Sequence, residues 1–297
     1  MPTVITPPDF LIDFGLTLRR YSAFGEDAAN LFDGNAFYKA FHAGESVHLL
    51  RISESAHGIE LQIEPEPHAD AVFAEGRRMA RQLLGLDAPL EAFYRFASSQ
   101  PVLCELVQKH RGARPTLSAT PFEMLVTSIT AQQINLPFAF AVRSRMVRKY
   151  GAAIESAGRT FFAFPTPQAL AKVEVIALRE MQFSTRKAEY IISLAQAIVS
   201  GELNLMQLER MTDAEIAEKL TRLRGIGQWT VDWFLARYLG RGHAIAAGDL
   251  GVRKAIEHYF FDGEKQAEAT IRAFAAGWGA FTNLAVHYLL LDFYAKK

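Results

Sequence analysis

The sequence predicts a mainly helical protein with a small α+β domain at its N-terminus. Alternating apolar residues, typical of strands, occur in short segments of the first hundred or so residues, and no alternating strand of any length follows about residue 120. Helix start signals recur through the rest of the chain. At 297 residues and 50% hydrophobic content, the chain is long enough for about two domains with buried cores. We place an α+β domain at residues 1–112 and an all-helical domain at residues 113–297.

The N-terminal domain is expected to contain a hairpin and at least one helix. Apolar residues alternate at 10–16 and again at 59–63, which predicts two strands. Residues 46–53 are expected to pair with the second of these strands across a tight turn. Residues 69–86 have helical spacing instead. A passage rich in Gly, Pro, Ser and Thr at 111–121 fits the domain boundary.

Three helix starts are predicted in the second domain. Thr120 with Glu123, and Thr212 with Glu215, have the spacing of a capping box, in which the threonine oxygen accepts a backbone N–H and the glutamate reaches back. Thr166 precedes a proline at what would be the first helical position. These signals divide the domain into helices joined by short loops.

Composition excludes several classes of function. Thirty-two basic and thirty-two acidic residues leave no net charge, so any basic surface must be local. The single cysteine, Cys104, rules out a disulfide framework or a thiolate cluster and is expected to fill the core. The eight histidines do not fall at ligand spacings, so we expect no structural metal and no cofactor. No targeting or membrane segment is evident, and we expect a cytoplasmic protein.

The segment "LTRLRGIGQWTVDWFLARYLG" at 220–240 predicts two helices joined by a loop of about four residues. Gly225 and Gly227 lack side chains, so backbone N–H groups near them can converge on one anion, and the second helix adds its positive N-terminal dipole. A DNA phosphate suits such a site. The carbonyl oxygens of Leu223 and Gly225 are candidate ligands for a monovalent cation. Taken alone, the glycine pair is more typical of a tight turn between helices.

Basic residues concentrate near this loop. The arginines expected to form a local basic face are Arg222, Arg224, Arg237, Arg241 and Arg253. Arginines on exposed helices are usually only solvated, so their support for DNA binding is modest.

An acidic residue follows Trp229 by twenty positions. Asp249 comes after a run of small and apolar residues and precedes a segment with helical spacing, which predicts a helix N-cap. An ordinary cap explains this position without any catalytic role. The two roles do not exclude each other.

These segments together resemble the helix–hairpin–helix (HhH-GPD) DNA glycosylase superfamily. The likeness rests on "LRGIGQWTVDWFLARYLGRG" followed by "AAGDLGVRKA", with further matches in "SITAQQIN", "FPTPQALA" and "STRKAEYIISLA". It extends over most of residues 112–297. The organisation of the N-terminal domain resembles that of the 3-methyladenine DNA glycosylase II (AlkA-type) branch. The resemblance therefore implies the helix–hairpin–helix glycosylase fold.

The resemblance also implies roles for individual residues. Arg224, Gly225, Ile226 and Gly227 match the hairpin that binds DNA phosphate, and Asp249 matches the catalytic acid. Bifunctional relatives carry a nucleophilic lysine two residues after the second hairpin glycine. Trp229 occupies that position here, which implies a monofunctional enzyme that uses water.

The resemblance further implies a base pocket and a plug for the gap left by a flipped base. Trp229 and Trp233, at i and i+4 on one helix face, match pocket aromatics, and Phe281 matches a third position where some relatives have tryptophan. Electron-rich rings suit a base made cationic by alkylation. Gln133 matches the plug that enters the minor groove, although an exposed helical glutamine is an equally good interpretation. Paired aromatics at helical spacing are also typical of ordinary core packing.

The predicted function is excision of alkylated purines from double-stranded DNA, chiefly 3-methyladenine with 7-methylguanine as a second candidate, by a monomeric enzyme. Two alternatives remain. One is a non-catalytic helix–hairpin–helix DNA-binding module, which Asp249 and the two tryptophans disfavour. The other is an oxidised-purine glycosylase/lyase, which the absence of lysine at position 229 disfavours.

Overall fold

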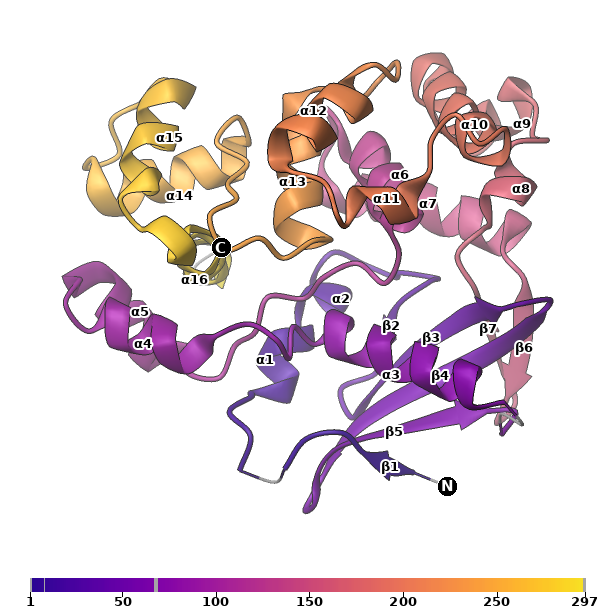
Figure 1. Cartoon of the computed structure of the whole chain (residues 1–297), viewed down its shortest axis with the longest axis horizontal. Helices are drawn as coiled ribbons and strands as arrows, with labels where there is room; N and C mark the ends of the chain where they lie inside the picture. The colour runs from indigo at the N-terminus through magenta and orange to yellow at the C-terminus, as the bar shows by residue number, and fades with distance from the viewer. Residues whose placement is uncertain (1, 8, 67–68, 296–297) are drawn as a thin grey trace.

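The computed structural model describes residues 2–7, 9–66 and 69–295. A sheet lies on one side of the molecule, and two groups of helices lie on the other (Figure 1). In chain order the elements are β1 (Thr3–Val4), α1 (Phe14–Leu18), α2 (Arg20–Ala23), β2 (Leu31–Phe32), β3 (Ala36–Ala43), β4 (Ser46–Ser55), β5 (Gly58–Glu64), α3 (Asp70–Leu83), α4 (Leu90–Ala97), α5 (Pro101–Lys109), α6 (Pro121–Ala131), α7 (Leu136–Tyr150), β6 (Ala153–Ser156), β7 (Arg159–Phe162), α8 (Pro167–Leu170), α9 (Val175–Arg179), α10 (Thr185–Val199), α11 (Leu205–Leu208), α12 (Asp213–Thr221), α13 (Gln228–Arg237), α14 (Leu250–Phe260), α15 (Glu268–Ala276), the 3-10 turn η1 (Gly279–Phe281) and α16 (Thr282–Ala295).

The sheet is antiparallel with strand order β1-β5-β4-β3-β2. The predicted hairpin is confirmed as β4 and β5, with Leu50 opposite Ile63. α3 packs on this sheet and confirms the predicted helix, and Gly76 lets it approach, because a Cβ there would come within 2.5 Å of Ile63. Buried apolar residues of both elements form one core cluster.

The predicted strand at residues 10–16 is wrong. The chain turns into α1 at Phe14, because the Asp13 side chain accepts a hydrogen bond from the Leu16 backbone N–H at 2.8 Å and caps a helix. Phe14 and Leu18 are then buried on one helical face against the sheet. Alternation over so short a segment fits either structure, and the cap decides between them.

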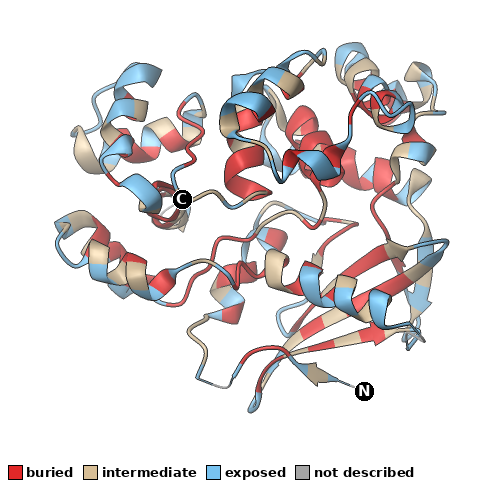
Figure 2. Ribbon diagram, viewed as in Figure 1, coloured by how far each residue is buried: buried red, intermediate tan, exposed pale blue. Residues whose placement is uncertain are grey.

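Residues from α6 to α13 form the first group of helices around a common core. α6 and α13 are buried along most of their lengths (Figure 2). The expectation of no strand after about residue 120 is wrong, because β6 and β7 form a hairpin. Phe161 of β7 stacks on Tyr38 of β3 at 5.1 Å between ring centroids, so the hairpin is stabilised by covering the sheet.

The second group of helices combines α14–α16 with α4 and α5. Phe93 of α4 packs on Tyr288 of α16, and Asp292 of α16 accepts a hydrogen bond from His110 at 2.8 Å. The predicted domain boundary at residue 112 therefore does not divide the hydrophobic cores, because α4 and α5 pack with the C-terminal helices rather than with the sheet. Cys104 of α5 is also only half-buried, which corrects its expected place in the core.

Buried polar contacts connect the sheet to α6 and α7. Lys39 of β3 pairs with Glu123 of α6 at 2.7 Å, and Arg143 of α7 pairs with Asp27 at 2.5 Å. Asn30 donates to both carboxylates. Glu123 therefore does not close the predicted capping box at Thr120, although Thr120 does accept the Glu123 backbone N–H. The capping box predicted at Thr212 and the N-cap predicted at Thr166 are both present.

Among the described residues, none of the helices by itself has the length and apolar character needed to span a membrane. One pair of helices has them in combination, residues 268–276 with residues 279–295, and this pair is bent by 116°.

Candidate active site and DNA interface

The hairpin is built between the end of α12 at Thr221 and the start of α13 at Gln228. Gly225 has φ of +87°, and a Cβ there would overlap the Tyr190 ring, so both backbone and packing require glycine. Gly227 differs, because its φ of −113° suits any residue and a Cβ there would meet nothing within 4 Å. The open side of Gly227 is therefore available to a ligand.

The N-terminus of α13 is left without a side-chain cap. Gly227 is its N-cap, and among the described residues no side chain accepts from its first N–H groups. The first N–H groups of a helix have no intrahelical acceptor and carry partial positive charge. This geometry suits an anion such as phosphate.

Gln132 attaches the end of α6 to the hairpin. Its side-chain amide donates to the Gly225 carbonyl at 2.9 Å and to Thr230 Oγ1 at 3.3 Å. The Leu223 carbonyl accepts the Ile226 backbone N–H at 3.2 Å, and Ile226 is buried. Both candidate cation ligands thus already accept one hydrogen bond and retain a second lone pair, so cation binding stays a prediction.

The expected basic face is smaller than the sequence suggested. Arg222 and Arg224 are exposed beside the hairpin. Arg237 is buried, Arg241 pairs with Asp213, and Arg253 donates to the Gln266 carbonyl. The prediction is wrong for these last three arginines. Arg237 on α13, Arg253 on α14 and Arg241 in the loop between these helices are all bound to groups of the protein itself.

Asp249 is the N-cap of α14, as predicted, and four N–H groups fix its carboxylate. Oδ1 accepts the backbone N–H groups of Gly251 at 2.8 Å and Val252 at 3.1 Å. Oδ2 accepts the indole N–H of Trp229 at 3.0 Å and of Trp233 at 3.4 Å. Donors to an ionised carboxylate stabilise its charged form. The two tryptophans therefore orient the acid in addition to lining the space beside it.

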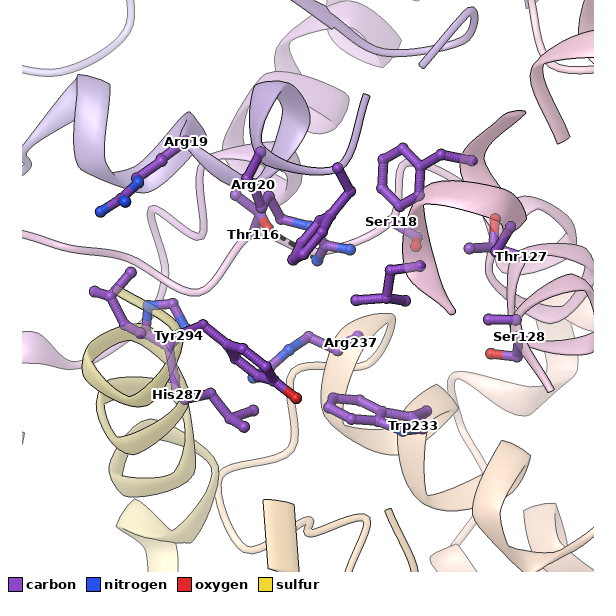
Figure 3. Close-up of a pocket in the computed structure, with 18 of the residues that line it drawn as sticks. Arg19, Arg20, Thr116, Ser118, Thr127, Ser128, Trp233, Arg237, His287 and Tyr294 are labelled. Carbon is purple, nitrogen blue, oxygen red and sulfur yellow. Dashed lines mark hydrogen bonds between the residues drawn. The ribbon is translucent and has the colours of Figure 1, made fainter. Parts of the chain in front are cut away.

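Asp249, Trp229 and Trp233 line a pocket of about 670 Å³ between the two groups of helices. Its remaining walls come from α1, α2, α6, α7, α16 and the segment that holds Thr116 and Ser118. Figure 3 shows Arg20 of α2, Ser128 of α6 and Tyr294 of α16 around the cavity. A volume of this size lies within the range of small-molecule sites. The pocket leaves one carboxylate edge of Asp249 beside a space large enough for a nucleobase.

Phe281 does not line this pocket, which corrects its predicted role. Its ring stacks on Phe96 at 5.0 Å and contacts Phe93 at 6.0 Å, because η1 lies against α4. The aromatic residue that α16 supplies to the pocket is Tyr294. Burial, and secondarily the charge of Asp249, raise the pKa of the Tyr294 hydroxyl.

Sequence reasoning missed Tyr294 because it lies near the chain end, 45 positions after Asp249 in the numbering, and belongs to no motif. The only local signal is its helical phase with other pocket residues of α16, His287, Leu290 and Leu291. Gly251 allows Tyr294 to come close to the start of α14, because a Cβ at position 251 would lie 2.5 Å from the Tyr294 hydroxyl.

Gln133 is exposed and has a positive φ of 55°, which is uncommon for a residue other than glycine. It follows the C-cap of α6 and lies in sequence between Ala131 and Leu136, which both line the pocket. Its place is compatible with a plug beside a flipped base, and that role stays a prediction.

Comparisons with known proteins agree with the predicted superfamily. A family model described as HhH-GPD superfamily base excision DNA repair protein matches residues 126–280. The Bacillus subtilis protein YfjP is 32% identical over 191 residues, which cover 64% of this chain and 65% of that protein. A DNA-3-methyladenine glycosylase of Bacillus subtilis is 30% identical over 204 residues, covering 69% of this chain and 67% of that protein.

A solved structure is similar over nearly the whole chain. The 3-methyladenine DNA glycosylase from Archaeoglobus fulgidus has a TM-score of 0.87 and 28% identity, covering 98% of this chain and 97% of that chain. These relatives confirm the predicted fold and the resemblance to the 3-methyladenine glycosylase branch. Because the family model spans more than half of the sequence, the chain belongs to the HhH-GPD superfamily of base excision DNA repair proteins.

Proposed function

We propose that this protein is a monofunctional DNA glycosylase that removes alkylated purines from double-stranded DNA by hydrolysing the N-glycosidic bond. The observation that carries the proposal is the fixed carboxylate of Asp249 at the edge of a pocket of about 670 Å³, next to a hairpin suited to phosphate. The names of the Bacillus and Archaeoglobus relatives support the choice of 3-methyladenine, with 7-methylguanine as the second candidate.

Asp249 acts on the sugar. As the bond to the base breaks, positive charge develops on the deoxyribose, and a preorganised carboxylate beside it stabilises that charge. The same carboxylate orients the attacking water and accepts its proton. Four donors already hold the carboxylate in place, so little reorganisation is needed in the transition state.

The absence of an amine at position 229 favours water as the nucleophile. Trp229 donates its indole N–H to Asp249 and cannot form a Schiff base. Lys254, the nearest lysine to Asp249 in sequence, is exposed and is not among the pocket-lining residues. These positions disfavour the glycosylase/lyase alternative.

The target base must leave the duplex to reach Asp249, which requires base flipping. We propose that the N–H groups beside Gly227 and the side chain of Arg224 bind backbone phosphate and fix the position of the strand. Gln133 is proposed to fill the gap in the duplex. We further propose that the enzyme acts as a monomer.

The test is incubation with methylated duplex DNA and chromatography of the released bases, with Asp249→Asn beside the wild type. We expect release of methylpurine by the wild type and a loss of about 10²-fold or more in the variant, the scale of losing one electrostatic catalytic group. Asp13→Asn is the matched control, since it alters an exposed helix N-cap outside the pocket and should retain activity.

Three outcomes contradict parts of the proposal. No release by the wild type, with DNA binding intact, indicates the non-catalytic module. Equal release by wild type and Asp249→Asn removes Asp249 from catalysis. Strand cleavage without heat or added base indicates lyase activity.

A further inference from the structure

One wall of the cavity beside Asp249 carries positive charge. Asp249 is the only carboxylate among the described lining residues, whereas the lining arginines are Arg19, Arg20, Arg143 and Arg237. Arg143 is neutralised by its buried pair with Asp27 at 2.5 Å. Within the described part of the chain, the other three arginines have no carboxylate partner. Arg20 and Arg237, which we call the arginine wall, come from different elements and are considered in turn.

Arg237 of α13 brings an almost fully buried charge to the arginine wall. Its guanidinium donates through Nη1 to the Asn283 side chain and to the Ala236 carbonyl at 3.4 Å, and both acceptors are uncharged. Among the described residues, no hydrogen bond uses its Nε or Nη2. These two nitrogens are also not among the sealed polar atoms, so they reach the space of the cavity. The edge of the guanidinium that they form suits a bidentate contact with an oxyanion.

Arg237 stays charged despite its burial. Burial, and secondarily the charge of Arg20, lower the pKa of Arg237 to about 9, so the side chain is protonated at neutral pH. The one neighbouring charge that affects this pKa is thus another cation. A buried charge without an opposite charge beside it is unfavourable, and such a charge at a cavity is a candidate for ligand binding.

Arg20 of α2 faces the same part of the cavity (Figure 3). Its Nη1 donates to Thr116 Oγ1 at 3.2 Å, and its guanidinium lies over the Tyr21 ring at 5.5 Å. Neither contact neutralises its charge. The cavity therefore receives one positive charge from the N-terminal part of the chain and another from α13.

His287 of α16 shows independently that this part of the cavity is electropositive. Burial, and secondarily the charges of Arg237 and Arg20, hold the pKa of His287 well below its ordinary value, so the ring is neutral. The effect of both arginines on one ring also places the three side chains near one another. A third cation is thus disfavoured at this place, and an anion is favoured.

The chemistry of the arginine wall identifies the class of anion. Guanidinium groups bind phosphate with paired, charge-assisted hydrogen bonds. A tetrahedral phosphate group can present oxygens to two guanidiniums that approach from different directions, whereas a planar carboxylate has only two oxygens in one plane. The Thr116 hydroxyl, which also lines the cavity, lies beside Arg20 and adds a neutral polar group.

We propose that the arginine wall is an oxyanion site, in which the Nε and Nη2 edge of Arg237 and the guanidinium of Arg20 together bind one phosphate group. Both DNA and inorganic phosphate supply such a group, and the experiments distinguish these two sources. A phosphate bound there links α2 to α13 across the cavity. The site goes beyond the proposed excision reaction, and its tests need no release of a base.

Thermal unfolding with added inorganic phosphate tests for a site that takes free phosphate, with ionic strength held constant by potassium gluconate. If free phosphate is the ligand, the unfolding midpoint of the wild type should rise and saturate as phosphate is added. Arg237→Met should weaken the apparent affinity about tenfold or more, the scale of losing charge-assisted hydrogen bonds. Arg237→Lys keeps the charge without the bidentate edge and should weaken it less.

Three further variants separate this site from effects on folding and from the hairpin. Arg20→Met changes an exposed position and should weaken the phosphate response in the same direction as Arg237→Met. Arg114→Met is the matched control, since Arg114 is buried and donates to backbone carbonyls outside the pocket. It should lower the starting midpoint but keep the phosphate response. Gly227→Val obstructs the hairpin and should keep the part of the response that depends on Arg237.

Fluorescence anisotropy with an undamaged labelled duplex, at several salt concentrations, tests for a site that takes DNA phosphate. If a DNA phosphate is the ligand, Arg237→Met should weaken duplex binding about tenfold and reduce the slope of log affinity against log salt by about one. If only inorganic phosphate is bound, Arg237→Met and the wild type should bind the duplex equally. The wild type should then show the saturable thermal response.

The His287 ring provides a local measurement. A phosphate bound at the arginine wall adds negative charge nearby and should raise the pKa of His287, which NMR titration of the ring follows with and without inorganic phosphate. His287→Gln identifies the signal by its loss. In Arg237→Met, phosphate should leave this pKa unchanged.

The outcomes that overturn the proposal are specific. A phosphate response that Arg237→Met and Arg20→Met both retain places the bound phosphate elsewhere and overturns the site. The absence of any phosphate response, together with unchanged duplex binding in Arg237→Met, overturns it for both sources. Failure of the wild type to release methylpurine contradicts the proposed function and leaves this site standing.

Discussion

At the scale of single residues, the indole N–H groups of Trp229 and Trp233 determine what Asp249 can do. A lysine at position 229 would bring a nucleophile to the sugar, whereas tryptophan brings a donor that fixes the carboxylate. Each hydrogen bond to a charged group contributes about 1.5–3 kcal/mol. The same side chains thus disfavour the lyase mechanism and hold the carboxylate in the orientation that the proposed hydrolytic mechanism uses.

His287 gives a prediction about pH at this scale. Because burial depresses its pKa in the folded protein, the unfolded chain binds a proton below about pH 6.5 that the folded protein does not. Stability from this group is present above that pH and lost as pH falls. Relative to His287→Met, the wild type should lose about 1 kcal/mol of unfolding free energy between about pH 6.5 and 5.5.

Urea unfolding at several pH values measures this difference. His57→Gln, at an exposed histidine, is the control and should follow the wild type. Parallel pH dependences for the wild type and His287→Met would show that His287 titrates normally in the folded state.

At the scale of elements, the hairpin between α12 and α13 separates two uses of glycine. Gly225 serves the fold, because its positive φ and the adjacent Tyr190 ring exclude a side chain. Gly227 faces open space, where we propose that DNA phosphate binds. The motif therefore combines one glycine that the fold requires with one that we propose is used in binding.

This difference predicts opposite effects of two substitutions. Gly225→Ala should lower the free energy of unfolding by about 2 kcal/mol or more, since both strain and overlap result. Gly227→Val should cost at most about 1 kcal/mol as a poorer N-cap but should weaken duplex DNA binding about tenfold or more, because the side chain blocks the N–H groups.

Denaturant unfolding and fluorescence anisotropy with a labelled duplex measure these two effects. Unchanged DNA affinity in Gly227→Val would show that Gly227 forms part of the turn and does not contribute to DNA binding.

At the scale of the whole molecule, buried polar contacts between the sheet and the first group of helices position the pocket. Lys39 and Glu123 are both almost fully buried and pair at 2.7 Å, and Asn30 joins this pair to Asp27 and Arg143. Arg143 lines the pocket, so the sheet is connected to the site through this network. The N-terminal elements thus support the pocket rather than forming an independent unit.

Replacing one partner of the Lys39–Glu123 pair should lower the free energy of unfolding more than replacing both partners. Lys39→Met leaves a buried carboxylate unpaired and should lower the free energy of unfolding by about 3–5 kcal/mol. The double variant Lys39→Met, Glu123→Leu should be less destabilised than the single variant. Denaturant unfolding measures both.

The exposed pair of Arg222 and Glu218 supplies the control, and Arg222→Met should cost less than about 1 kcal/mol. An equal loss of unfolding free energy in Lys39→Met and Arg222→Met would show that burial does not strengthen the interaction of Lys39 with Glu123.

Features encoded by nearby residues could be predicted from the sequence. The hairpin of β4 and β5, the capping box of Thr212 and Glu215, and Asp249 as an N-cap all depend on residues a few positions apart. The shared face of Trp229 and Trp233 follows from helical spacing alone. These parts of the fold and the site were therefore predictable from local patterns.

Other features depend on residues far apart in sequence, and only the tertiary structure decided them. Helices α4 and α5 pack on the C-terminal helices, although they are far from them in sequence. The ring of Phe93 contacts the ring of Tyr288, and the Tyr94 and Tyr288 hydroxyls share a hydrogen bond. The same packing turns Phe281 away from the pocket and leaves Tyr294 to line it. Arg237 likewise faces inward because its helix is buried. Local pattern determines which face a residue occupies, whereas long-range packing determines what that face meets.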